Sequence, residues 1–239
     1  MTPGQQQATF PLRMMTDRVR CFAVALLLLA SGPGLAQSPP SDAEVSTYTD
    51  LHLAAHRGDV SQIEALIADG ADIEQVDGSG RTALHIAAFA SHENVVLALA
   101  RAGSNMNALE NQAYDIVTIA AVANDLEVLD TALSNGASPS NITSPYDGTA
   151  LIAAAHLGHH EVVKRLIDAG APLDHVNNIS WTALIEAVVL GDGGPNHVQT
   201  ARHLINAGAN RNITDGYGRT PLDLARERGY REMIKLLEE

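Results

Sequence analysis

Histidine is the residue type in this chain that most readily suggests chemistry. The sequence contains ten histidines, and His156, His159 and His160 form the densest group. A zinc site uses three or four convergent ligands at set spacings. The sequence offers no His-Glu-x-x-His motif and no cysteine pair, since Cys21 is its single cysteine. We therefore predict that the chain binds no metal and carries no cofactor.

Carboxylates are the second group that could do chemistry. The chain has 28 Asp and Glu residues, but no motif singles out a pair of them. It also lacks the Gly-x-Ser-x-Gly nucleophile turn, the phosphate-binding Walker loop and the Gly-x-Gly-x-x-Gly dinucleotide fingerprint. The expected function is accordingly non-enzymatic.

Composition narrows the class of partner. Aromatic residues make up only 4% of the chain, which argues against a deep aromatic-lined pocket and against a platform for stacked bases. The formal net charge is −13; without residues 1–36, which hold three arginines and one aspartate, 12 basic and 27 acidic residues remain. Such acidity repels nucleic acid and favours a basic partner, although it also serves solubility.

One short sequence recurs and sets the architecture. The stretch from Gly80 to Ala88 reads Gly-Arg-Thr-Ala-Leu-His-Ile-Ala-Ala, and versions of it return at intervals of 33, 33, 34, 33 and 38 residues. The threonine of this stretch, Thr82, corresponds in the other copies to Thr49, Asp115, Thr149, Thr182 and Thr220. A second marker keeps the same period, because a helix-ending glycine follows an apolar-periodic segment at Gly70, Gly103, Gly136, Gly170 and Gly208.

This Thr-x-Leu-His pattern at about 33 residues resembles the ankyrin repeat, a β-turn followed by two antiparallel helices. The resemblance implies an all-α solenoid of about six helix-turn-helix repeats with short β-turn fingers. The predicted repeats are 48–77, 78–110, 111–144, 145–177, 178–215 and 216–239. It also implies that His52 and His85 hold neighbouring turns by hydrogen bonds. His92 and His159 occupy the position of the histidine in the family's Gly-His pair, at the start of the outer helix.

The first 36 residues have the pattern of a secretory signal peptide. Arg13, Arg18 and Arg20 precede an apolar run of about ten residues, too short to span a membrane, and Gly34 and Ala36 fit a cleavage site. Residues 37–47 have no apolar period and are expected to form a flexible tether. We therefore expect a periplasmic or secreted protein that has no membrane segment after cleavage.

The resemblance places partner-binding residues on the fingers and at the ends of the inner helices, which together line a concave face. Tyr, Trp and Arg, the residue types most common at interface hot spots, recur at finger positions. Packing of Trp181 over a neighbouring turn is the alternative for that residue. The candidate protein-binding residues are Arg81, Phe89, Tyr114, Tyr146, His156, Trp181, Tyr217 and Arg219.

The predicted function is binding of a partner protein by a monomeric, exported module. Its Trp-Thr-Ala-Leu-Ile-Glu-Ala stretch and Gly-Asp-Gly-Gly insertion resemble exported bacterial ankyrin repeat proteins. That resemblance suggests two further alternatives. One is an accessory factor in peroxide and catalase protection, and the other is an immunity protein that neutralises a secreted toxin.

Overall fold

The computed structural model describes residues 37–239, so the predicted signal peptide, residues 1–36, lies outside the described part. The described residues form 13 helices and one isolated bridge between Thr143 and Gly148. The helices are α2 (Asp42–Val45), α3 (Asp50–Arg57), α4 (Val60–Ala68), α5 (Ala83–Phe89), α6 (Glu93–Arg101), α7 (Ile116–Ala123), α8 (Leu126–Ser134), α9 (Ala150–Leu157), α10 (His160–Asp168), α11 (Ala183–Val189), α12 (Pro195–Asn206), α13 (Pro221–Arg228) and α14 (Arg231–Glu238).

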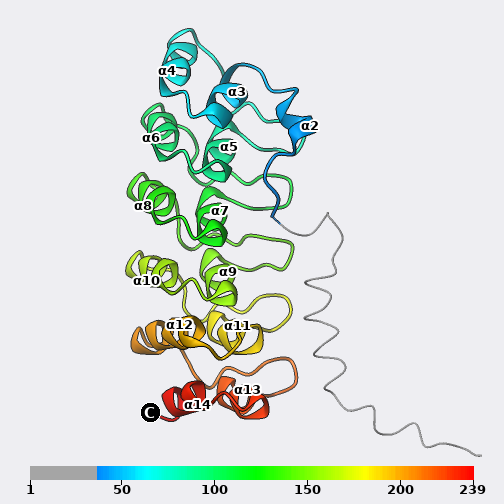
Figure 1. Ribbon diagram of the computed structural model, residues 1–239, viewed down its shortest axis with the longest axis vertical. Helices are drawn as coiled ribbons and strands as arrows, with labels where there is room; N and C mark the ends of the chain where they lie inside the picture. Colours follow the sequence, from blue (N-terminus) through cyan, green and yellow to red (C-terminus); the bar gives the residue numbers. More distant parts are fainter. Residues whose placement is uncertain (1–36) are drawn as a thin grey trace, which may run out of the picture. The chain divides into compact units, whose positions relative to one another are not determined.

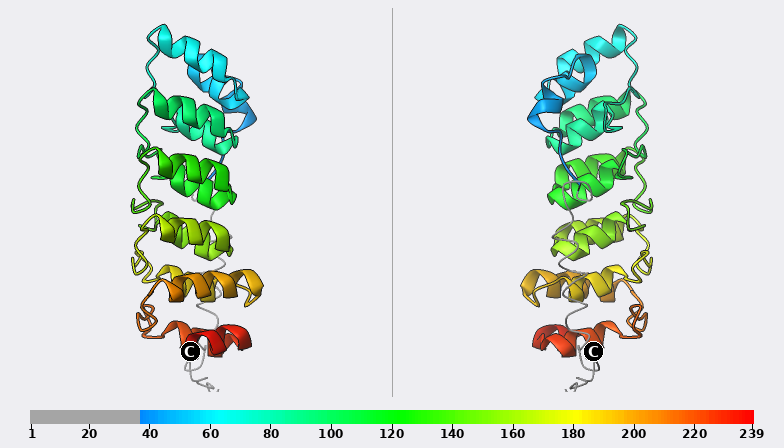
Figure 2. Two further views of the ribbon diagram at one scale, coloured as in Figure 1. Left: turned by 90° about the vertical axis from the view of Figure 1, so that its left-hand side faces the viewer. Right: turned by 90° about the vertical axis from the view of Figure 1, so that its right-hand side faces the viewer.

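From α3 onward the helices form six antiparallel pairs stacked in order along the chain (Figure 1). The first helix of each pair packs against the first helix of the next pair, and the second helices pack in the same way. Two columns result, an inner one from α3 to α13 and an outer one from α4 to α14 (Figure 1), and the outer column faces the viewer in the left view of Figure 2. This arrangement confirms the predicted all-α solenoid of helix pairs.

The core lies between the two columns and between successive pairs. Alanines on the inner helices, such as Ala87, Ala120 and Ala154, are fully buried and let neighbouring helices approach closely. Larger aliphatic side chains fill the remaining space, and burial of each contributes about 1.5–3 kcal/mol relative to exposure. The largest fully buried side chains include Ile63, Leu84, Leu99, Ile119, Leu129, Leu151, Leu166, Leu184 and Leu204.

The recurring Thr and Gly positions begin and end the helices as expected. Thr82, Asp115, Thr149, Thr182 and Thr220 are all N-caps with extended backbone, and Asp115 Oδ1 accepts from the Thr118 amide at 2.8 Å. The five predicted helix-ending glycines all have positive φ, between 87° and 98°. These positions favour glycine because side chains strain that backbone conformation.

The segment predicted as a flexible tether, residues 37–47, is instead partly helical. Ser41 and Glu44 form a capping box around α2, in which the Ser41 amide donates to Glu44 Oε2 at 2.8 Å. The helix was not expected because it has no apolar period; its order comes from this box and from polar contacts made by Glu44.

Repeat five contains the predicted insertion, and the structure shows it as an ordered loop. Asp192 Oδ1 accepts from the Gly194 amide at 2.7 Å and lies 3.0 Å from His197 Nδ1. Tyr230 of the last pair donates its hydroxyl to the Gly191 carbonyl at 2.9 Å. The loop therefore contacts α12 of its own repeat and the last repeat. Among residues 37–239, no helix is long and apolar enough to cross a membrane.

Candidate functional site

The loops that join each outer helix to the next inner helix are called fingers here, and four of the five share one construction; in the α8–α9 finger, Thr143 and Gly148 form a backbone bridge instead. At the base of a finger, a side-chain oxygen accepts from the backbone amides two and four residues later. Asp77 Oδ1 accepts from Ser79 and Arg81 at 2.8 and 2.9 Å. Asp215 Oδ1 does so from Tyr217 and Arg219 at 2.9 and 3.0 Å. Glu110 and Asn177 play the same part in the α6–α7 and α10–α11 fingers.

Neighbouring fingers are also bonded to each other. The Asn111 amide donates to the Ser79 carbonyl at 3.0 Å, and the Asn178 amide donates to the Tyr146 carbonyl at 2.9 Å. Glu74 Oε1 accepts from the Asn105 amide of the next finger at 2.8 Å. The fingers therefore form a continuous edge along one side of the array, where they project to the right in Figure 1.

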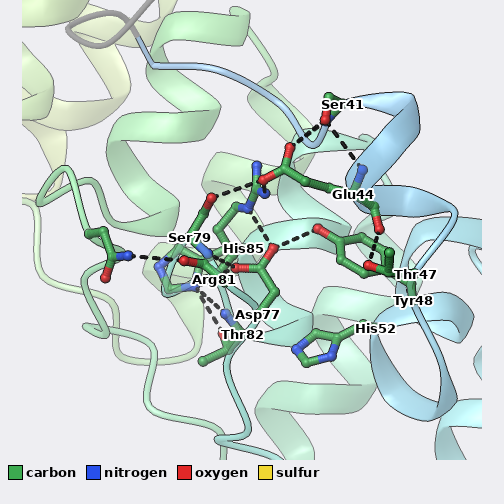
Figure 3. Close-up of polar contacts among 12 residues, drawn as sticks. Ser41, Glu44, Thr47, Tyr48, His52, Asp77, Ser79, Arg81, Thr82 and His85 are labelled. Atoms are coloured by element: carbon green, nitrogen blue, oxygen red, sulfur yellow. Dashed lines mark hydrogen bonds and ion pairs between the residues drawn. The ribbon is translucent and has the colours of Figure 1, made fainter.

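At the N-terminal end, α2 and Tyr48 take the place of a finger (Figure 3). Glu44 stands five residues before Thr49, as Asp77 stands five residues before Thr82. Arg81 donates from Nε to Asp77 Oδ2 at 2.8 Å and forms an ion pair with Glu44 through its terminal nitrogen. Ser79 Oγ donates to Glu44 at 2.9 Å, and the Tyr48 hydroxyl donates to Asp77 Oδ2 at 2.6 Å.

These contacts set the charges of the cluster. Hydrogen bonds from the Ser41 backbone and side chain, followed by Ser79 and Arg81, lower the pKa of Glu44 to about 2. Burial opposes ionisation of Asp77, but hydrogen bonds from Tyr48 and Arg81 outweigh it and hold the Asp77 pKa below its usual value. Burial, together with the bond to Asp77, raises the pKa of Tyr48. Two carboxylates thus flank one buried guanidinium.

Three of the predicted binding residues are buried and are not available to a partner in this conformation. Arg81, Tyr114 and Trp181 are 3%, 7% and 8% exposed. All three directly precede an inner-helix N-cap, whereas Arg219, at the same position before Thr220, is partly exposed. For Trp181, this burial favours the packing alternative.

The other five predicted residues remain accessible to different degrees. Phe89, Tyr146, His156 and Arg219 are partly exposed, and Tyr217 is 64% exposed. The Arg219 guanidinium lies 5.2 Å from the centre of the Tyr217 ring, within cation–π range. His156 Nδ1 lies 3.4 Å from Glu186 Oε2, a buried carboxylate that also accepts from Asn177 at 3.2 Å. The structure does not bring these five into one cluster.

The histidines mostly serve the backbone. His52 Nε2 and His85 Nε2 each lie 3.0 Å from a carbonyl of the following finger, Gln75 and Ala108. Because a carbonyl only accepts, each ring nitrogen must donate. This confirms that both residues hold neighbouring turns. Burial lowers the pKa of His85, which keeps the ring neutral.

A second set of ring contacts reaches the preceding inner helix. His92 Nε2 lies 3.2 Å from the His56 carbonyl, and His159 Nδ1 lies 3.0 Å from the Ala121 carbonyl. His197 Nε2 makes the equivalent contact with the His156 carbonyl at 3.0 Å. Within the described residues, no group of three His, Cys, Asp or Glu side chains is placed to hold a metal ion.

The structure exposes one set of residues that the sequence analysis missed. Val76, Leu109, Ile142 and Val176, called the apolar row here, are 44% to 54% exposed. Val76, Leu109 and Val176 directly precede the base residues of their fingers, and Ile142 holds the equivalent place before Thr143. The four recur at spacings of 33, 33 and 34 residues. That spacing was readable in the sequence, because it matches the period of the helix caps; the exposure of these side chains was not.

Comparisons with known proteins agree with this architecture. A family model for ankyrin repeats in three copies matches residues 20–110 and 117–215. The ankyrin repeat protein YahD of Escherichia coli (strain K12) is 35% identical over 190 residues, which is 79% of this chain and 94% of YahD.

Two solved structures extend the likeness. An ankyrin repeat domain from Acinetobacter baumannii AYE is 42% identical with a TM-score of 0.75, covering 79% of this chain and 95% of that domain. The ankyrin repeat domain of Bcl-3, 22% identical with a TM-score of 0.73, covers 98% of this chain and 100% of that domain and shows the fold alone. Because the family model spans most of the sequence and the bacterial relatives match over nearly their full lengths, this chain belongs to the ankyrin repeat family.

Proposed function

We propose that this chain is a non-catalytic module that binds a partner protein along its fingers. Ankyrin repeat proteins are generally protein-binding modules. The observation that carries the proposal here is the apolar row: Val76, Leu109, Ile142 and Val176 leave about half of their surface in water at the same place in four successive fingers.

The fingers do not need these side chains in order to form. Their shape comes from side-chain oxygens that accept backbone amides, as Asp77 and Glu110 do, and from bonds between neighbouring fingers. Single exposed apolar residues are common on protein surfaces. A row that repeats with the period of the fold, and that residues 37–239 leave uncovered, favours contact with another protein.

We further propose that the protein works after export, in the periplasm of a bacterium. The support is the sequence of residues 1–36 and the similarity to bacterial relatives. Cell fractionation of a chain tagged at its C-terminus tests this: we expect a periplasmic product whose intact mass corresponds to a start at Gln37. A product of full mass in the cytoplasm would contradict export.

The binding proposal is tested by crosslinking and affinity capture from the fraction that contains the protein, with partners identified by mass spectrometry. The native chain is compared with Leu109→Asp/Ile142→Asp, which places two charges in the apolar row. Leu157→Asp is the matched control, because Leu157 is 41% exposed but lies at the end of α9, outside the row.

We expect one enriched protein that the row variant loses and the control retains. Circular dichroism and thermal unfolding establish that both variants are folded. Retention of every partner by the row variant would contradict binding along the fingers. The captured protein also distinguishes a toxin-neutralising function from one in peroxide defence, since the first predicts a secreted toxin and the second a catalase-linked protein.

A further inference from the structure

The geometry of the apolar row restricts the shape of the segment that can bind it; this inference rests on the function proposed above. Each finger is a reversal of the chain, and neighbouring fingers are joined by backbone bonds such as Asn111 to Ser79 at 3.0 Å. One repeat therefore adds two hydrogen-bonded chain widths of about 4.8 Å each, or about 9.6 Å. Packing of neighbouring helices at about 8–10 Å gives a similar step.

A partner segment that touches all four residues of the row must present apolar side chains at this step on one face. A β-strand repeats its faces every two residues, about 6.7 Å, and every four residues, about 13 Å. An α-helix offers a seven-residue step of about 10.5 Å, but its side chains turn by about 20° at each step. A polyproline II segment has three residues per turn and advances about 9.3 Å, with the same face returning each time.

Carboxylates near the apolar row indicate which residues of the partner segment lie between its apolar side chains. Glu74 and Asp174 each lie two residues before a member of the row and are exposed, and Asp147 is exposed beside the α8–α9 finger. Glu74 and Asp174 each accept a backbone amide of the next finger at 2.8 Å, so their carboxylates are held at the finger edge. The described residues as a whole carry 12 basic against 27 acidic side chains.

We propose that the apolar row receives an extended, polyproline II-like segment of a partner protein. This segment has an apolar side chain at every third residue and lysine or arginine between them. Each apolar residue lies against one of Val76, Leu109, Ile142 and Val176, and the basic residues face the carboxylates of the finger edge. The preformed conformation of such a segment lowers the entropy lost on binding.

Synthetic peptides test this inference directly. Three fluorescent peptides of identical length and composition carry one leucine for each residue of the row, with lysines and prolines in equal number. In the first the leucines stand at every third position, in the second at every seventh and in the third at every second. Binding to the chain that starts at Gln37 is measured by fluorescence anisotropy at low and high salt.

We expect the every-third peptide to bind at least about tenfold more tightly than the other two, a difference of about 1.4 kcal/mol. Its affinity falls as salt rises, because the lysine–carboxylate contacts are exposed and are screened. Leu109→Asp/Ile142→Asp loses this preference, and Leu157→Asp keeps it.

Tighter binding of the every-seventh peptide would overturn the inference in favour of a helical partner. Equal affinity of all three peptides, or no binding by any of them, would overturn it as well. None of these results bears on the capture experiment, because loss of a natural partner from the row variant would still support binding along the fingers.

Discussion

The α4–α5 and α12–α13 fingers have almost the same sequence and different surroundings. They read Asp-Gly-Ser-Gly-Arg-Thr from Asp77 and Asp-Gly-Tyr-Gly-Arg-Thr from Asp215, so five of six residues agree. In both, the aspartate accepts the same two amides and the arginine Nε donates to it, at 2.8 and 2.9 Å. The remaining guanidinium contacts differ.

Arg81 meets Glu44 of α2 and has a side chain that is 4% exposed, whereas Arg219 meets Glu227 of α13 and has a side chain that is 20% exposed. The six-residue motif therefore determines the turn and the arginine–aspartate pair. A residue 37 positions earlier in the chain, Glu44, pairs with Arg81, and only the arginine differs in burial between the two fingers, since both aspartates are buried. Identical local chemistry should then contribute differently to stability at the two fingers.

The largest difference is expected from removal of the two arginines. Arg81→Ala leaves the buried Asp77 and the partly exposed Glu44 without a cation, and we expect it to lower the free energy of unfolding by about 3 kcal/mol, mainly through Asp77. Arg219→Ala removes a guanidinium that is 20% exposed and that pairs with the buried Asp215 and the half-exposed Glu227, so the loss should be smaller, about 1–2 kcal/mol. Urea unfolding followed by circular dichroism measures both. Equal losses would mean that α2 does not change the energetics of the finger.

The second prediction concerns acid. The pKa of Glu44 is about 2 when folded, below its usual value of 4.5. A lowered carboxylate pKa contributes stability that is complete above about pH 4.5 and is lost as the pH falls toward 2. In Glu44→Gln this part of the pH dependence should disappear, so that its stability falls less steeply than that of the native chain between pH 4.5 and 2.

Glu227→Gln is the matched control, because Glu227 accepts from Arg219 at 3.1 Å in the finger that α2 does not cover. It should keep the native acid slope. Thermal unfolding at a series of pH values compares the three proteins, and identical slopes for Glu44→Gln and the native chain would refute the assignment.

The smallest effects are expected at the one position where the two motifs differ. Ser79→Ala removes the hydroxyl that donates to Glu44 at 2.9 Å and should cost about 1 kcal/mol. Tyr217→Ala removes a side chain that is 64% exposed and should change stability by less than about 0.5 kcal/mol. Urea unfolding midpoints of the two variants, analysed with one common dependence of the unfolding free energy on urea concentration, measure both losses. A larger loss for Tyr217→Ala than for Ser79→Ala would contradict the prediction.

Much of the fold could be predicted because its determinants are local and repeat. Thr82 and Asp115 cap helices by contacts within one turn, and glycines such as Gly103 end them by backbone conformation alone. Burial between fingers could not be predicted in this way. Whether Arg81 or Trp181 faces water depends on residues about a repeat away, and an apolar period says nothing about that.

The N-terminal helix and the apolar row were not predicted from the sequence, for two different reasons. Ser41 and Glu44 have the spacing of a capping box. The one-turn helix that they form buries no apolar face, so its sequence has no apolar period that would predict a helix. Val76 and its equivalents have the period of the repeat but lie outside the helices, so no amphipathic helix pattern indicates their exposure. An alignment of the repeats would have shown both: Glu44 stands five residues before Thr49, as Asp77 does before Thr82, and the residues of the apolar row share one position in successive repeats.

The inserted loop of repeat five has a consequence for how the array unfolds. Its Asp192 and His197 are linked, His197 reaches the carbonyl of His156 in repeat four, and Tyr230 of the last pair holds the Gly191 carbonyl. Repeat proteins usually exchange energy only between nearest neighbours. The contacts around the inserted loop strengthen the coupling of repeat five to both of its nearest neighbours, so the amides of α9 to α14 should exchange with solvent as one cooperative unit.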